Sequence, residues 1–146
     1  MVARASRSTV TPGPVTLAAL EAARAAEREQ TLFYRALAGL AEDHADANVA
    51  ERINGLLADE QHHYSRLSAR MMEAGHTPAE GSGEGERPDV LVGWESAARE
   101  RERAEIVRYE SLLRLDLDDR TRAMVDEILA SERRHVRELG GKWMGA

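Results

Sequence analysis

The stretch AEREQTLFY at residues 26–34 places a Glu seven residues before a Tyr, and RERAEIVRY at residues 101–109 repeats that spacing. Further along each half of the chain comes a Glu three residues before a His, in DEQHHY at residues 59–64 and in SERRH at residues 131–135. Both halves therefore carry the same two motifs in the same order. This internal repeat predicts two similar helical hairpins that assemble into one structure.

The repeated motifs bring together residue types that bind metal ions. On an α-helix, side chains three residues apart project from the same face, so each Glu-x-x-His pair can hold one ion. Carboxylates and imidazoles suit Fe(II) and Mn(II), and four carboxylates nearly neutralise two divalent ions. Each motif alone is loose in a chain with 18 Glu, but both occur twice on predicted core-facing stripes. The predicted ligands of this dinuclear site are Glu27, Glu60, His63, Glu102, Glu132 and His135.

The composition indicates one α-helical domain and restricts its partners. The chain has 146 residues, with one Phe, two Trp and three Tyr, and Ala, Leu, Arg and Glu dominate. A net charge of −6 argues against nucleic acid and anionic membranes as partners, and favours cations. The absence of Cys excludes disulfides, thiolate catalysis and iron–sulfur clusters. Without an apolar membrane span or a secretory signal in the sequence, we expect a cytoplasmic protein.

Apolar residues at helical spacing predict four helices, over residues 15–43, 46–74, 90–115 and 119–140. Gly75 is expected to end the second helix, and Asp89 to cap the third. Residues 1–14 are predicted to form a flexible tail, and the Gly- and Pro-rich residues 76–89 a linker between the halves. An extended linker of this length can run the length of a bundle. We therefore predict an all-α antiparallel four-helix bundle, made of two hairpins with a long crossover between the second and third helices.

The four quoted strings resemble those of the ferritin-like superfamily, and within it the rubrerythrin-type branch, over residues 17–140. The resemblance implies two bound iron ions, with manganese as an alternative at one or both positions. It implies that Glu27 and Glu102 are terminal ligands, that Glu60 and Glu132 bridge the ions, and that His63 and His135 bind one ion each. Rubrerythrin-like proteins are similar in having an additional Glu on the third helix. Glu105 is therefore a candidate seventh ligand.

Other residues near the motifs have separate interpretations. Tyr34 and Tyr109 are expected to lie two turns from the ligands on the same stripes, with their phenols next to the site. His62 points about 100° away from His63 around the helix, so we expect it in solvent or at an interface. The remaining expectations concern a surface role for Glu73 and His76, and a role in capping the core or in a subunit contact for Trp94 and Trp143.

The resemblance implies a protein that oxidises Fe(II) with O₂ or H₂O₂, of the ferroxidase or peroxidase type, in iron handling or oxidative-stress defence. Because the chain has no Cys, a fused rubredoxin-like donor is excluded, and repeated turnover would need an external electron donor. Two alternatives remain open: a non-catalytic metal-binding or iron-delivery module, and a metal-free four-helix interaction protein. We also expect a homodimer, since proteins of this type dimerise and sometimes exchange helices.

Overall fold

The computed structural model describes residues 12–44, 46–81, 85 and 87–140. This part of the chain forms four α-helices and no strand. They are α1 (Pro14–Asp43), α2 (Ala47–Glu73), α3 (Trp94–Leu113) and α4 (Asp119–Glu138). No helix in the described part of the chain combines the length and the apolar character that crossing a membrane requires.

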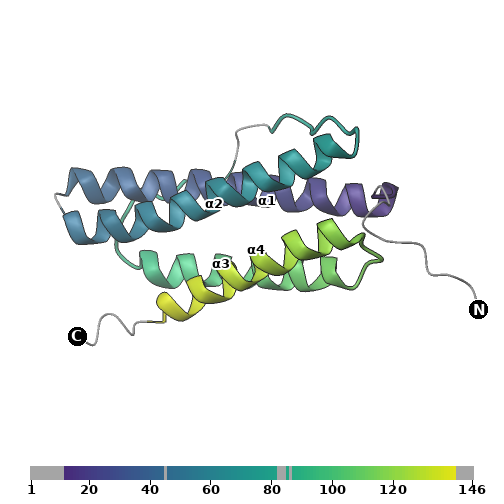
Figure 1. Cartoon of the computed structure of the whole chain (residues 1–146). Helices are drawn as coiled ribbons and strands as arrows, with labels where there is room; N and C mark the ends of the chain where they lie inside the picture. Colours follow the sequence, from purple (N-terminus) through teal and green to yellow (C-terminus); the bar gives the residue numbers. More distant parts are fainter. Residues whose placement is uncertain (1–11, 45, 82–84, 86, 141–146) are drawn as a thin grey trace, which may run out of the picture.

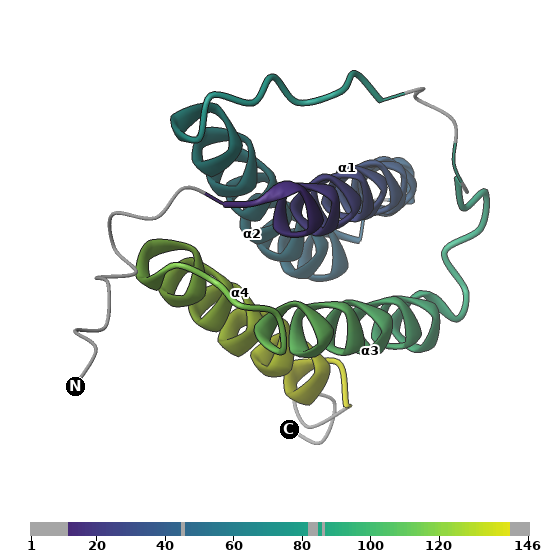
Figure 2. The same ribbon diagram turned by 90° about the vertical axis from the view of Figure 1, so that its right-hand side faces the viewer.

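The helices form two antiparallel hairpins, α1 with α2 and α3 with α4, which face each other as two layers (Figures 1 and 2). Across the layers, α1 packs against α3 and α2 against α4. In Figure 1, α2 ends and α3 begins at opposite ends of the bundle. The connection must therefore join those ends. Its path stays a prediction, because residues 82–84 and 86 lie outside the described residues.

The helix starts follow from local chemistry at three of the four positions. Pro14 is the first residue of α1, where a missing N–H costs nothing, so α1 includes the last residue assigned to the predicted tail. Residues 1–11 of that tail lie outside the described residues. Asp46 caps α2 by accepting from the Val49 amide at 3.2 Å. Asp118 caps α4 by accepting from the Thr121 amide at 3.1 Å.

The predicted start of the third helix is wrong. The sequence placed it at residue 90 with Asp89 as the cap, whereas α3 begins at Trp94 after Gly93. Gly93 has a φ of +78°, a left-handed conformation that breaks the helix there. The Trp94 amide closes a turn by donating to the Leu91 carbonyl at 3.1 Å. Val92 is 92% exposed, so this apolar residue of the predicted stripe does not face the core.

The core consists of two apolar clusters, one toward each end of the bundle. One cluster contains Leu20, Leu67, Met71, Tyr109, Leu112 and Ile128 among others. The second contains Phe33, Tyr34, Leu37, Ile53, Trp94 and Leu139 among others. Along every helix, the residues between the two clusters include buried Glu or His. The apolar core is therefore interrupted at mid-length by a polar layer to which all four helices contribute.

Trp94 belongs to the second apolar cluster and is 7% exposed. The Arg52 guanidinium lies 5.1 Å from the centre of its ring, a cation–π distance. Trp94 therefore closes the core at the start of α3, as expected from the sequence. Trp143 lies outside the described residues.

Candidate metal centre

The polar layer contains all six residues that the repeat singled out, and each is at most 4% exposed. Donor atoms of these residues form two groups, within each of which all atoms lie within 4.8 Å of one another. The first group consists of Glu27, Glu60, His63 and Glu132, and the second of Glu60, Glu102, Glu132 and His135. Glu60 and Glu132 are thus shared, while each group has one Glu and one His of its own.

Each imidazole faces its group through Nδ1. Nδ1 of His63 lies 3.3 Å from Glu27, 3.2 Å from Glu60 and 3.3 Å from Glu132. Nδ1 of His135 lies 3.2 Å from Glu102, 3.4 Å from Glu132 and 3.7 Å from Glu60. The two rings are 6.3 Å apart between centroids. The internal repeat of the sequence is therefore also a geometric repeat around the shared carboxylates.

Burial dominates the electrostatics of three of the carboxylates. It raises the pKa of Glu27 and of Glu102 to about 7, although a neighbouring His offsets part of the effect in each case. Burial also raises the pKa of Glu60 well above its ordinary value, and the adjacent carboxylates, Glu27 first, raise it further. In the protein alone, these carboxyl groups therefore hold protons far more readily than carboxyl groups in water do.

The imidazoles and Glu132 shift in the direction that lets them neutralise one another. Burial lowers the pKa of His63, but the nearby Glu132 and Glu27 outweigh it and raise the pKa to about 9. Glu102 and Glu132 raise the pKa of His135 to about 11 against the same effect of burial. Burial raises the pKa of Glu132, but the two imidazoles, His135 first, bring it down to about 2. Two imidazolium ions thus supply the positive charge of the metal-free centre.

Hydrogen bonding within the layer is incomplete, which is the direct test of whether metal ions fit. Buried polar atoms are normally paired, and a buried atom without a partner costs free energy. Several atoms that face the centre have no hydrogen-bond partner, and they belong to residues of both groups. They are Oε2 of Glu27, both carboxylate oxygens of Glu60 and Glu132, and Oε2 of Glu102. Nδ1 of His63 also lacks a hydrogen bond of good alignment, although three carboxylate oxygens lie 3.2 to 3.3 Å from it. These unpaired oxygen and nitrogen donors are the ligand types that Fe(II) and Mn(II) accept, so the residues fit a metal pair.

The two tyrosines contact the carboxylates of the opposite half. Tyr34 donates a hydrogen bond to Oε1 of Glu102 at 2.8 Å, and Tyr109 donates one to Oε1 of Glu27 at 3.0 Å. Both phenols therefore contact carboxylates of the polar layer. The sequence spacing related each Tyr to the Glu on its own helix, whereas the contacts run between α1 and α3. Each phenol fixes one oxygen of an unshared carboxylate and leaves the other without a hydrogen-bond partner.

Glu105 lies outside both groups of donor atoms, although it is only 5% exposed. Its Oε2 has no hydrogen-bond partner, and Nε of Arg108 is 3.9 Å away. Burial, and then the charge of Glu27, raise the pKa of Glu105 to about 8. Together with Gln30 and Arg101 it lines a surface groove of about 260 Å³. Glu105 is thus a buried acid beside the centre.

The residues interpreted as surface groups lie away from the centre. His62 is exposed. Glu73 pairs with Arg120 at 2.6 Å, and His76 lies 3.4 Å from Glu21. Glu73 and His76 therefore interact with different partners and do not form a pair with each other.

Asp59 is a residue that the sequence analysis missed. Its Oδ2 lies 2.8 Å from Nε2 of His135, the ring nitrogen that points away from the centre. A carboxylate behind a metal-binding imidazole fixes the orientation and tautomer of the ring. Asp59 directly precedes Glu60, but the corresponding residue before Glu132 is Ser131, so Asp59 is not part of the repeat. The available signal was an acid next to a motif Glu.

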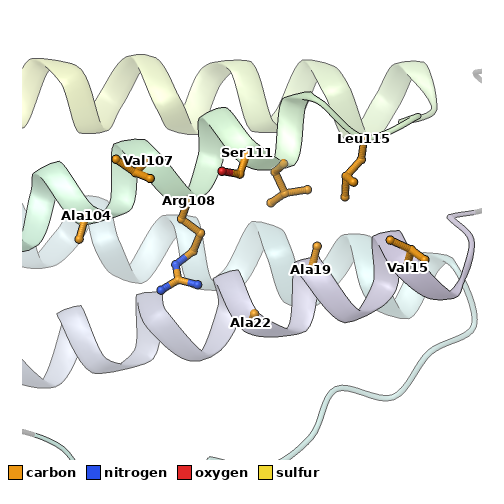
Figure 3. A pocket seen from close by; sticks show the side chains of 9 residues that line it. Val15, Ala19, Ala22, Ala104, Val107, Arg108, Ser111 and Leu115 are labelled. Atoms are coloured by element: carbon orange, nitrogen blue, oxygen red, sulfur yellow. The ribbon is translucent and has the colours of Figure 1, made fainter.

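A larger groove lies between α1 and α3, toward one end of the bundle (Figure 3). It has a volume of about 470 Å³ and is lined by Val15, Ala19, Ala22, Ala104, Val107, Arg108, Ser111, Leu112 and Leu115. None of the six clustered residues lines it. This groove therefore does not present an organic substrate to the polar centre.

Comparison with known proteins supports the fold through structure and not through sequence. No family model and no curated protein matches the sequence. The structure is similar to a bacterioferritin from Desulfovibrio desulfuricans, with a TM-score of 0.79 and 20% identity over 86% of this chain and 75% of that one. It is also similar to a dodecameric thioferritin, the bacterioferritin-related protein from Bacteroides fragilis. There the TM-score is 0.74 and the identity 22%, over 86% of this chain and 82% of that one.

The protein is thus an all-α bundle with a buried carboxylate–imidazole centre at mid-length. Its fold is the ferritin-like four-helix bundle, as the sequence predicted.

Proposed function

We propose that the protein binds a pair of iron ions in the polar layer and promotes the oxidation of Fe(II). The observation that carries this proposal is the pair of overlapping donor groups with unpaired, buried oxygen and nitrogen atoms. The bacterioferritin has a diiron site, which supports iron as the metal. Mn(II) suits the same donors and is the alternative metal.

The ligand roles follow from which residues the two groups share. Glu60 and Glu132 belong to both groups, so we assign them as bridging ligands. Glu27 with His63, and Glu102 with His135, complete one position each. Glu105 lies outside both groups and is not one of the proposed ligands.

The chain's own residues prepare the centre for metal and manage its protons. Metal binding requires an unprotonated Nδ1 on each imidazole and ionised carboxylates, so loading should release protons from groups whose pKa values are raised. Tyr34 and Tyr109 hold one oxygen of each unshared Glu and leave the other for a ligand bond. The two Fe(II) ions are the substrate and supply two electrons to H₂O₂. Two protons from the surroundings of the centre complete its reduction to two water molecules. Peroxidase turnover would in addition need an external electron donor to return the iron to Fe(II).

The decisive experiment is an anaerobic titration of the metal-stripped protein with Fe(II). We expect two tight equivalents per chain. Glu60→Gln and Glu132→Gln each remove a shared carboxylate and should weaken both equivalents, whereas Glu27→Gln should weaken one. Glu127→Gln is the matched control on the surface of α4, where the side chain is 65% exposed and should not affect binding. If the wild type bound no Fe(II) tightly, the proposal would be wrong, and a metal-free four-helix interaction protein would remain as the alternative.

Oxidant addition separates catalysis from storage or delivery of metal. When O₂ or H₂O₂ is added to the protein with two equivalents of Fe(II), the absorbance of Fe(III) should appear within seconds. Two tightly bound ions that stay ferrous under oxidant would contradict the ferroxidase proposal and indicate a non-catalytic metal-binding module.

Self-association is part of the same proposal. The sequence suggested a homodimer, and the thioferritin is described as dodecameric. Sedimentation equilibrium on the metal-loaded and metal-stripped protein gives the assembly size directly, and a monomer in both states would contradict this part of the proposal.

A further inference from the structure

The two imidazoles of the centre differ in what their outer nitrogen contacts. Nε2 of His135 faces Oδ2 of Asp59 at 2.8 Å. In the described part of the chain, the ion pairs of His63 all run through Nδ1, and none runs through Nε2. The other features of the two groups are closely matched, because each has one unshared Glu held by one Tyr, at 2.8 Å and 3.0 Å. The outer nitrogens are therefore where the internal symmetry of the ligand set breaks.

The sequence explains this break. DEQHHY and SERRH align through their Glu and His, so Ser131 takes the position that Asp59 has in the other half. The Ser131 hydroxyl accepts from Nη2 of Arg134 at 3.4 Å, and the same nitrogen lies 3.3 Å from Oδ2 of Asp59. Ser131 is also shorter than Asp and carries no charge. Among the described residues, one carboxylate and not two therefore pairs with an outer imidazole nitrogen.

We propose that Asp59 is a positioning residue that makes the two metal positions unequal, so that the position containing His135 binds metal more tightly and fills first. This inference rests on the dinuclear centre proposed above. Asp59 touches neither the centre nor a reacting atom, and acts only through the His135 ring.

The physical argument concerns the tautomer and the orientation of the ring. An imidazole binds metal through an unprotonated nitrogen, so a ring that ligates through Nδ1 must carry its proton on Nε2. Asp59 accepts that N–H, which selects this tautomer, holds the ring toward the centre and makes Nδ1 a stronger donor. His63 must adopt the same tautomer without a carboxylate paired to Nε2 in the described part of the chain. Loss of such an outer partner typically weakens metal affinity about 10- to 100-fold, which sets the expected difference between the two positions.

Co(II) is a suitable probe for two reasons. Unlike Fe(II), it does not react with dioxygen at such sites, and its visible spectrum reports its coordination. Calorimetric and absorbance titrations of the metal-stripped protein should show two binding steps, separated by about 10- to 100-fold in Kd. Asp59→Asn retains an acceptor without the charge, and Asp59→Ala removes both. The tight step should weaken in the order wild type, Asn, Ala, until the two steps merge.

The matched variant is Ser131→Asp, which by the internal repeat should place a carboxylate next to Nε2 of His63. It should tighten the weak step and leave the strong one unchanged. Asp126→Asn, at an exposed position of α4, is the control for loss of a negative charge and should change neither step. Circular dichroism and thermal melts of the metal-stripped variants verify that each one folds before binding is compared.

A spectroscopic signature identifies the ring that binds first. In the protein with one Co(II), the Nε2 proton of the bound imidazole should give a paramagnetically shifted, slowly exchanging proton resonance, which Asp59→Ala should abolish. Two steps of equal affinity in the wild type, or equal weakening of both steps by Asp59→Ala, would overturn the inference and leave the dinuclear centre standing. Failure of the wild type to bind Co(II) or Fe(II) at all would overturn the proposed function as well.

Discussion

Four carboxylates packed in the middle of a helical bundle need compensating positive charge, because burial without it is costly. In the protein alone that charge comes from protons on His63 and His135, whose pKa values the neighbouring carboxylates raise against the effect of burial. A proton on Nδ1 and a metal ion are thus alternative occupants of the same space. Substitutions of single residues at the centre should therefore change its affinity for metal relative to its affinity for protons.

Tyr109 gives a test of one metal position at the residue scale. Tyr109→Phe keeps the buried ring but removes the hydrogen bond to Glu27, an unshared carboxylate. We expect the ion at the His63 position to bind about 10-fold more weakly, because Glu27 loses the contact that orients it. Titration with Co(II) should show this change in the weaker of the two steps.

Tyr34→Phe is the matched variant, since Tyr34 makes the corresponding contact to Glu102. It should weaken the stronger step instead. If both variants weakened both steps equally, the claim that each Tyr orients the Glu it contacts on the other helix would be wrong.

Glu105 gives a second test, in the metal-free protein and as a function of pH. Its folded-state pKa of about 8 lies above the ordinary 4.5, so its contribution to stability is complete below pH 4.5 and is lost as the pH rises to 8. Gln does not titrate. The stability of Glu105→Gln relative to wild type should therefore increase over this pH window, by on the order of 4 kcal/mol. Urea denaturation at pH 4.5 and at pH 8 measures the change.

The same variant examines whether Glu105 is a ligand. Glu105→Gln should retain both equivalents of Fe(II), because Glu105 lies outside the two donor groups. A variant that loses one equivalent would instead support the seventh-ligand role that the sequence resemblance suggested.

At the scale of helices, the start of α4 is tied to α2 by a buried ionic network. Asp118 caps α4 and accepts a hydrogen bond from Nη2 of Arg70 at 2.7 Å, while Nε of Arg70 donates to the Thr121 hydroxyl at 2.9 Å. Asp118→Ala removes the cap and leaves the Arg70 guanidinium without its buried partner. We expect a loss of about 3 kcal/mol in the free energy of unfolding, measured by urea denaturation.

The control for this prediction is the other capping aspartate. Asp46 caps α2 from an exposed position without a buried arginine, so Asp46→Ala should cost only about 1 kcal/mol. Similar losses in the two variants would mean that the contact with Arg70 contributes little to stability.

Helices and ligands differ in how far the sequence predicts them. Four helices were predicted because long apolar stripes at helical spacing leave few alternatives. The start of α3 was not, because Val92 extends the stripe in the sequence while the left-handed Gly93 precedes the first turn of α3 in the structure. The positions of the six clustered residues follow from the repeat. The crossed tyrosine contacts do not, because spacing along one helix says nothing about the register between α1 and α3.

At the scale of the whole molecule, the polar layer is the only buried region to which the described parts of all four helices contribute carboxylates or imidazoles. It separates the two apolar clusters, so neither cluster alone holds the bundle together at mid-length. Bound metal would join α1, α2, α3 and α4 at this level through six side chains. The effect of metal on stability should consequently be global.

We therefore predict that metal loading raises the melting temperature, and that it does so more at pH 8 than at pH 5. The folded-state pKa values of Glu27 and Glu102, about 7, exceed the ordinary 4.5, so the metal-free protein loses stability as the pH rises through this range. Metal-bound carboxylates are ionised already, which removes that loss. At a free metal concentration of about 100 times Kd, each position should add about 2.7 kcal/mol.

Calorimetric melts of the metal-stripped and Mn(II)-loaded protein at both pH values provide the measurement, since Mn(II) avoids oxidation during heating. For a domain of this size, the expected gain at pH 8 is on the order of 10 °C. A single transition that moves as a whole would indicate that the ions stabilise all four helices together. An unchanged melting temperature with two bound ions would mean that the metal occupies a layer already stable without it, in which case protons on the imidazoles suffice to hold the bundle closed.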